Sequence, residues 1–314
     1  MDSSTHVPSL SGRAVNAPVY SLRDAAQRAT AARELARGRP ALFYLGLYTA
    51  VRTLRSEHFD HGAAEYFWRV KPERPRWSKL PLVIRPQDSI RFIDFSQVHP
   101  ALRHLSRREY WSELWSHGAP LHVIAPLREP LRLVHPAFQT TPGDLRQQAR
   151  ANPAAADRSL GSTTASFFWM EDADWHDLAL RVSLYSPPGT YFGGTSFNDY
   201  GEHPPYTFEE LDVYLADRED IPFDFVITDP WFEAAGIHSS HTMVRLPLRG
   251  ESPEFVMTRR GSISPEFLES ITGFPVRPLA SVATASSQVG LSQKELDRRV
   301  RAFSIRRNAL TIGR

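Results

Sequence analysis

Strand-like and helical segments alternate along most of this chain, and that alternation constrains the fold more than any single motif does. The apolar, aromatic run at 39–51 is typical of a buried strand. It lies between helical stretches at 22–38 and 56–70, the first of which stops at Gly38. Further strand-like runs are 81–84, 90–95, 119–127, 165–170, 190–198, 223–228, 241–246 and 254–259, and further helical stretches are 105–117, 172–185, 207–219 and 264–273. Strands that alternate with helices predict an α/β sheet protein.

Size and composition exclude several classes of protein. A chain of 314 residues, 41% of them hydrophobic, can bury a core without a disulfide or a metal staple. It contains no cysteine, which excludes a disulfide framework, a Cys-based zinc site and a thiol nucleophile. No apolar run approaches the roughly 20 residues that cross a bilayer, and the N-terminus lacks the basic-then-apolar pattern of a signal peptide. We therefore expect a cytoplasmic protein with no membrane attachment.

Composition also predicts how the chain is organised. Residues 1–20 are expected to form a flexible leader, and 21–274 the main domain. The polar segment 140–162, rich in Ala, Pro and Arg, is interpreted as an exposed insertion or flexible loop. Residues 275–314 are expected to form a linker and a basic C-terminal helix. Limited proteolysis is expected to cut first in the leader and in the insertion, because neither can bury enough apolar surface to order itself.

The strongest motif is GTSFNDYGEHPPYTFEEL at 194–211. It combines the end of a strand, an S-x-N tripeptide at Ser196 and Asn198, a glycine turn and an acidic helix. Side chains two positions apart on a strand point the same way, so the hydroxyl and the carboxamide can hold ribose, phosphate or magnesium-bound oxygens together. By itself the tripeptide is weak evidence, because most such groups satisfy their own backbone in loops.

Five segments, taken in chain order, resemble the motifs of the YrdC-like family. The stretch 194–211 resembles TSAN-x-SGEPPPTTPEEL in that family. The others resemble iKxRpxxxPLivl, WPGPLTlvl, vDlIlDGGp…GieSTvvDl and vlRpGaIspeeLeevlG, and they are 70–84, 115–127, 223–246 and 254–273. The resemblance covers about 22–274. It implies a twisted, mixed α/β sheet with helices around a deep, positively charged cavity.

The resemblance also implies an activity and a set of site residues. The activity is ATP- and Mg²⁺-dependent formation of a carbamoyl- or N-carboxyamino-acid adenylate with release of pyrophosphate. Lys71 and Arg74 match the catalytic K-x-R motif with one residue inserted, although a solvated basic loop is the alternative interpretation. The implied nucleotide-binding residues are Thr195, Ser196, Asn198, Thr242 and Arg259, and Arg260 has an equal claim to the place of Arg259. Fixed cations suit this chemistry because charge develops on phosphate oxygens and on the leaving pyrophosphate.

One segment departs from the family pattern and affects the acceptor pocket. Where the family has FPTeTvYGLg, this chain has FYLGLYTAV at 43–51, so Leu45, Gly46 and Leu47 replace the polar Thr-Glu-Thr. Tyr48 and Thr49 are left as the expected polar lining. A more apolar wall predicts a larger or less polar acceptor than threonine, in a specialised, secondary-metabolite carbamoylation. The alternative is a non-catalytic nucleotide- or RNA-binding descendant of the same fold.

Two further features are interpreted without a binding role. His238 and His241 could be a metal pair, but no third ligand is near in sequence, so a turn with surface histidines is the preferred interpretation and no protein-held metal is expected. The arginines after residue 297 lack an aromatic ladder and are interpreted as a solvated helix or an oligomer contact. The expected partners are thus ATP and a small-molecule amine or carbamoyl donor, with a protein or RNA as the further acceptor.

Overall fold

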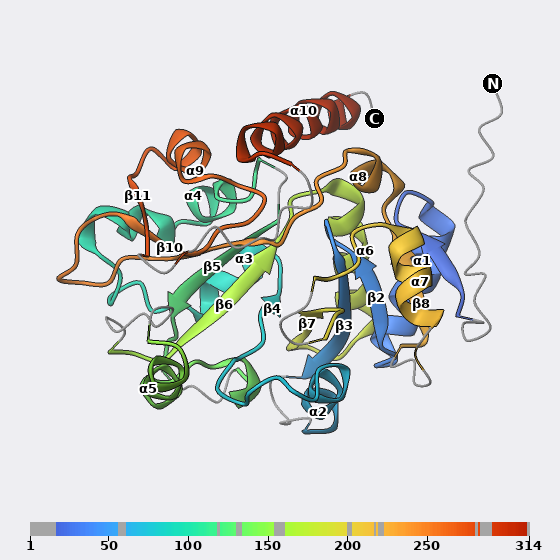
Figure 1. The fold of residues 1–314 in the computed structure, drawn as a ribbon, viewed down its shortest axis with the longest axis horizontal. Coiled ribbons are helices and arrows are strands. Elements are labelled where there is room, and N and C mark those ends of the chain that lie inside the picture. Colours follow the sequence, from blue (N-terminus) through green and yellow to red (C-terminus); the bar gives the residue numbers. More distant parts are fainter. Residues whose placement is uncertain are drawn as a thin grey trace.

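The described part of the chain folds around one mixed β-sheet. The computed structural model describes residues 17–55, 61–117, 120–129, 134–153, 161–199, 203–216, 218, 223–279, 282 and 291–312. Within these residues eleven strands form the sheet, in the order β1-β8-β2-β3-β7-β4-β6-β5-β9-β10-β11 (Figure 1). The strands are β1 Val19–Ser21, β2 Ala41–Tyr44, β3 Tyr48–Arg55, β4 Leu82–Val83, β5 Leu121–Pro126, β6 Thr164–Trp169, β7 Thr190–Ser196, β8 Phe225–Thr228, β9 Thr242–Arg245, β10 Phe255–Arg259 and β11 Val276–Pro278. The predicted α/β class is confirmed.

Helices cover the sheet and its edges. They are α1 Ala25–Ala36, α2 His61–Val70, α3 Pro86–Ser89, α4 Arg108–Glu113, α5 Pro142–Ala151, α6 Ala173–Tyr185, α7 Phe208–Ala216, α8 Pro230–Ala234, α9 Pro265–Thr272 and α10 Gln293–Ile312. In Figure 1, α1, α6 and α7 lie at the end of the sheet that holds β2, β3 and β8, and α4 and α9 lie near β10 and β11. The predicted strand at 90–95 is wrong, since Ile90–Phe92 is a short 3-10 helix.

A buried ion network fixes the starts of three helices. The guanidinium of Arg23 contacts the carboxylates of Asp172, Asp174 and Asp229. Asp172 also caps the first turn of α6, and Asp229 caps the first turn of α8. Buried carboxylates need such partners, because an unpaired charge in a protein interior is strongly unfavourable. Arg23, just before α1, therefore ties that helix to the N-termini of α6 and α8.

The sheet extends beyond two of the predicted boundaries. β1 pairs in parallel with β8, with Val19 opposite Val226, so the end of the predicted leader belongs to the sheet. β11 pairs with β10 beyond residue 274. Residues 1–16 lie outside the described residues. α10 is anchored after that strand by side chains that join the hydrophobic core, namely Leu296, Val300 and Phe303.

The segment predicted to be an exposed insertion contains a helix. α5 starts at Pro142 with a capping box, in which Thr141 accepts from the backbone of Asp144 and the Asp144 carboxylate accepts from the backbone of Thr141. Pro142 suits the first helical position because its missing N–H needs no partner there. Of the two interpretations of 140–162, an exposed insertion or a flexible loop, the flexible loop is therefore wrong for 142–151. Residues 154–160 lie outside the described residues.

No helix in the described ranges is long and apolar enough to cross a membrane.

Candidate functional site

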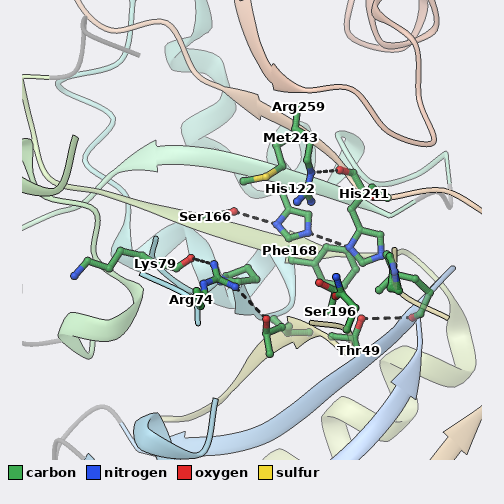
Figure 2. A pocket seen from close by; sticks show the side chains of 17 residues that line it. Thr49, Arg74, Lys79, His122, Ser166, Phe168, Ser196, His241, Met243 and Arg259 are labelled. Carbon is green, nitrogen blue, oxygen red and sulfur yellow. Dashed lines mark hydrogen bonds between the residues drawn. The ribbon is translucent and has the colours of Figure 1, made fainter. Parts of the chain in front are cut away.

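A cavity of about 230 Å³ opens between the two halves of the sheet. Thr49 of β3 and the end of β7 line one side, while β5, β6, β9 and β10 contribute the other (Figure 2). Its cationic lining residues are Arg74, Lys79 and Arg259, and no Asp or Glu is among the described lining residues. The cavity is therefore positively charged, as predicted.

Lys71 contacts the end of β7 and is not itself part of the cavity lining. Its ammonium donates to Ser196 Oγ at 2.9 Å and to Asn198 Oδ1 at 2.6 Å. The two acceptors point the same way because they are two positions apart at the end of the strand, as the S-x-N motif predicts. Burial, together with the nearby charges of Arg74 and Arg259, lowers the pKa of Lys71 from 10.5 to about 7. Small changes of charge in the cavity can therefore change the protonation of this amine near neutral pH.

Arg74 is held rigidly at the cavity by three oxygens. Its Nε donates to the Ser78 carbonyl at 2.7 Å, and its two terminal nitrogens donate to Thr195 Oγ1 at 3.0 Å and to the Lys79 carbonyl at 2.5 Å. The loop after α2 thus brings Arg74 to the cavity despite the inserted residue in the K-x-R pattern. A guanidinium with a fixed orientation can bind a phosphate or carboxylate with little loss of side-chain entropy.

Of the two arginines with equal claims, Arg259 faces the cavity. It stands at the end of β10 and donates from Nε to the His241 carbonyl at 2.8 Å. Burial and the charge of Arg74 lower its pKa to about 10. Arg260 instead donates to the side chain of Gln293 on α10. The strand's alternation separates the two side chains, one to the cavity and one to the C-terminal helix.

Three predicted site residues, Lys71, Thr242 and Tyr48, are not among the residues that line the cavity. Thr242 is fully buried, and its hydroxyl donates to the Ile263 carbonyl and accepts from the Ile263 amide, so it joins β9 to the segment before α9. Tyr48 packs its ring against Tyr44, with centroids 5.1 Å apart. Leu47 and Thr49, its neighbours along the chain, line the cavity instead. Tyr48 and Thr242 are therefore corrected as binding residues, while Thr195 and Thr49 do line the cavity.

Two histidines and a serine also line the cavity. They are far apart in the sequence, and no motif predicted that they would meet. His122 Nε2 lies 3.0 Å from His241 Nδ1, and His122 Nδ1 lies 3.1 Å from Ser166 Oγ. Burial, the other histidine and the arginines hold the pKa of His122 well below its ordinary value, and burial with Arg259 lowers that of His241 to about 3. His238, the other histidine of that motif, stacks on Tyr206. The interpretation of both as surface histidines is wrong for His241, which is buried.

A second cavity of about 310 Å³ continues from the first. The two share five lining residues, which are Arg74, Lys79, Ser166, Met243 and Arg259. Leu145 and Gln148 of α5 form part of its wall, and Asp144 pairs with Lys79 at 3.1 Å. The segment predicted to be an insertion thus closes one side of a ligand-sized space.

The residues at the cavity do not form a site for Mg²⁺ by themselves. Among the residues that the structure describes, no three His, Asp or Glu side chains are grouped to hold a metal ion. Mg²⁺ prefers carboxylate, phosphate and water oxygens, whereas this lining offers hydroxyls, one carboxamide, two imidazoles and cations. An ion in this cavity would have to be bound chiefly by the oxygens of a ligand.

Several solved structures are similar to this one. No protein-family model and no curated protein matches the sequence. Sua5 from P. abyssi in complex with L-threonine is similar in structure, with a TM-score of 0.52 and 16% identity over 88% of this chain and 65% of that one. A double variant of the same protein gives a TM-score of 0.54 with the same identity and coverage. A hypothetical protein from Streptococcus mutans UA159 gives 0.50 at 11% identity, over 84% of this chain and 99% of the other.

These likenesses extend over most of the described sheet and its helices. This chain spans about two thirds of the length of the P. abyssi protein, 65% of that chain. The shared architecture includes a mixed sheet with helices on it, which is the class that the motif order implied. The described part of this protein therefore shares the fold of the matched part of Sua5.

Proposed function

We propose that this protein is a diverged YrdC-like enzyme that uses ATP to make a carbamoyl- or N-carboxyamino-acid adenylate and releases pyrophosphate. One observation carries the proposal. Within a Sua5-like fold, Arg74, Arg259, Ser196 and Asn198 line one cavity whose described lining residues include no carboxylate, and Lys71 donates hydrogen bonds to Ser196 and Asn198. Such a set binds anions and places fixed cations where charge develops during phosphoryl chemistry.

The chemistry assigns a role to each group. The amine of the acceptor bonds to the carbon of bicarbonate with loss of water, which gives an N-carboxylate. An oxygen of this carboxylate attacks the α-phosphorus of ATP, the bond from that phosphorus to the bridging oxygen breaks, and pyrophosphate leaves. Arg74 and Arg259 neutralise charge on the phosphate oxygens, and neither needs to move because backbone carbonyls already hold them. Lys71 orients Ser196 and Asn198, which position the phosphates. Mg²⁺ would enter with the nucleotide and supply further positive charge to it.

The pocket wall supports an acceptor other than threonine. The P. abyssi protein has been solved with L-threonine, so a ligand of amino-acid size fits this fold. Here Leu47, Val83, Phe168 and Met243 line the cavity beside the polar groups. Each extra methylene that an acceptor buries against them is worth about 0.8 kcal/mol. We propose a specialised carbamoylation of a less polar amine or amino acid.

Acceptor-dependent pyrophosphate release tests this function. Purified protein is incubated with ATP, Mg²⁺ and bicarbonate and with threonine, ammonia, carbamoyl phosphate or larger amino acids. Release is expected with an acceptor that has more apolar surface than threonine, and little with threonine. Efficient use of threonine would contradict the pocket assignment while leaving the adenylation proposal intact. Measurable ATP binding without release for any acceptor would favour the second candidate, a nucleotide-binding protein without catalysis.

Nucleotide binding is expected to take up a proton at pH 8. With a pKa of about 7, Lys71 is mostly neutral at that pH. A phosphate anion beside it favours the ammonium form and raises its pKa. Titration calorimetry with ATP in buffers of different ionisation enthalpy should therefore show proton uptake at pH 8 and less at pH 6. Lys71→Met should bind without this uptake, and uptake equal to that of the parent would mean that another group is responsible.

A further inference from the structure

Three side chains at the cavity form a directed hydrogen-bond chain. His241 Nε2 lies 2.7 Å from the Leu45 carbonyl, which can only accept, so Nε2 carries the proton. In the neutral ring, Nδ1 of His241 must then accept, and His122 Nε2 donates to it across 3.0 Å. His122 Nδ1 is left without a proton and accepts the hydroxyl of Ser166 at 3.1 Å. The Leu45 carbonyl thus fixes the tautomers of His241 and His122, and the unprotonated Nδ1 of His122 faces the hydroxyl of Ser166.

Packing holds this chain in place and leaves its end accessible. His122 and His241 are each only 5% exposed. The ring of Phe168 stacks on His241 with centroids 4.6 Å apart and also contacts the ring of His122 at 4.7 Å. Ser166, by contrast, is half-buried on β6 and lines both cavities. Figure 2 shows it at the cavity end of the chain, between Arg259 and Arg74.

A nucleophile, a base within hydrogen-bond reach and a third group that orients the base are the signature of covalent catalysis. We propose that Ser166 is a nucleophile that takes an acyl or carbamoyl group from a phosphate-activated donor, with His122 as its general base and His241 as a positioning residue. This inference rests on the proposed function for the nature of the donor, a mixed anhydride of an acyl or carbamoyl group with phosphate.

The step balances without a further reagent. Ser166 Oγ attacks the carbonyl carbon of the mixed anhydride, and its proton passes to His122 Nδ1. The bond from the carbonyl carbon to the phosphate oxygen breaks, and the phosphate leaves as an anion between Arg74 and Arg259. The acyl or carbamoyl ester of Ser166 is then attacked by an amine or hydroxyl of the acceptor, or by water. His122 first releases the serine proton to the leaving phosphate or to solvent. It then takes a proton from the attacking amine, hydroxyl or water and gives it to Ser166 Oγ as the ester bond breaks.

The charges around Ser166 make its reactivity depend on whether the donor carries a phosphate. Arg259 and Arg74 face the histidines, and together with burial they disfavour a proton on His122. A phosphate bound between the two arginines offsets their charge and makes the base stronger. A donor that carries phosphate should therefore react with Ser166 faster than a neutral ester of the same acyl group.

Covalent labelling tests the proposal. The full-length protein is incubated with acetyl adenylate, with carbamoyl phosphate and with the neutral ester p-nitrophenyl acetate, and the adduct is mapped by peptide mass spectrometry. We expect one acetyl or carbamoyl group on Ser166, formed faster from the two phosphate donors. Ser166→Ala should lose it, and His122→Gln should slow it about 100-fold. Ser183→Ala, which changes an exposed serine of α6, is the matched control and should label like the parent.

The role of His241 has its own pair of variants. Glutamine can donate to the Leu45 carbonyl and accept from His122 Nε2, whereas phenylalanine keeps the stack on Phe168 but can do neither. Labelling should therefore fall about 10-fold or more in His241→Phe, a modest share of what acid–base catalysis supplies, and recover in His241→Gln. Equal loss in both variants, with both folded by circular dichroism, would overturn the positioning role.

Failure of this inference can be told apart from failure of the proposed function. ATP binding and pyrophosphate release are measured on the same preparation. Unlabelled Ser166 in a protein that releases pyrophosphate overturns the nucleophile alone, as does an adduct that maps to Lys71. Labelled Ser166 in a protein that neither binds ATP nor releases pyrophosphate overturns the adenylation proposal and leaves the nucleophile. Even if His122→Gln does not fold, equal labelling by phosphate donors and the neutral ester in the parent would contradict the phosphate dependence.

Discussion

Replacing Lys71 with methionine is expected to lower acceptor-dependent pyrophosphate release by about 100- to 1,000-fold, the usual cost of removing one preorganised donor at a developing charge. Methionine has nearly the length of lysine but cannot donate to Ser196 Oγ or Asn198 Oδ1. Both acceptors would lose the group that orients them. The measurement is steady-state release at saturating ATP, together with the affinity for ATP. A variant with the activity of the parent would remove Lys71 from the mechanism.

The same substitution should change how stability depends on pH. The pKa of Lys71 is about 7 in the folded protein, against an ordinary 10.5. Between these values the unfolded chain binds more protons than the folded one, so the free energy of unfolding of the parent rises with pH from about 7 to 10.5. Lys71→Met should lack this contribution. Denaturant unfolding at pH 6, 8 and 10 measures the slope, and Lys294→Met, at an exposed lysine of α10, should keep the slope of the parent.

Replacing Gly261 with alanine is expected to destabilise the protein by about 3 kcal/mol, the upper end of the usual cost of overpacking. A Cβ there would lie 2.1 Å from the Ser240 carbonyl oxygen and 2.5 Å from backbone atoms of His241 and Thr242. These are backbone atoms, which cannot rotate away as a side chain could. The Ser262 amide also donates to the Ser240 carbonyl at 2.9 Å, so relieving the clash would break a hydrogen bond.

The effect of Gly261→Ala should extend to the cavity. Gly261 lies two residues after Arg259, and the backbone atoms that it contacts include one of His241. Pyrophosphate release and the labelling of Ser166 should therefore fall along with the free energy of unfolding. Chemical denaturation measures the free energy of unfolding. Gly161→Ala is the control, because a Cβ there meets no heavy atom within 4 Å, and it should change stability by no more than about 0.5 kcal/mol. Equal stability of the two variants would show that the Ser240–Thr242 segment is free to move.

Much of the polar and charged lining of the cavity could be predicted from the sequence. Ser196 and Asn198 share one direction because side chains on a strand repeat every two residues, and that holds whatever the rest of the fold does. The order of motifs predicted that Lys71, Arg74 and Arg259 would meet them. Arg74 and Arg259 line the cavity with both residues, and Lys71 donates hydrogen bonds to both without being part of the lining. Spacing could not show which of two neighbouring residues faces the cavity. Because side chains alternate along β3, Thr49 faces the cavity and Tyr48 packs against Tyr44. An alignment to the family motif that is wrong by one residue exchanges these two positions.

The sequence by itself determined the alternation of elements and the mixed α/β class, because each depends on local spacing or on motif order. Only the tertiary structure decided the rest. The helix at 142–151 is polar enough to be interpreted as a loop, yet a capping box and its place beside Lys79 stabilise it. His122 and His241 are 119 positions apart, and Ser166 is 44 from His122. Contacts across such distances follow from which strands pair, and β5 lies between β6 and β9 only in the assembled sheet. The hydrogen-bond chain that ends at Ser166 exists for that reason alone.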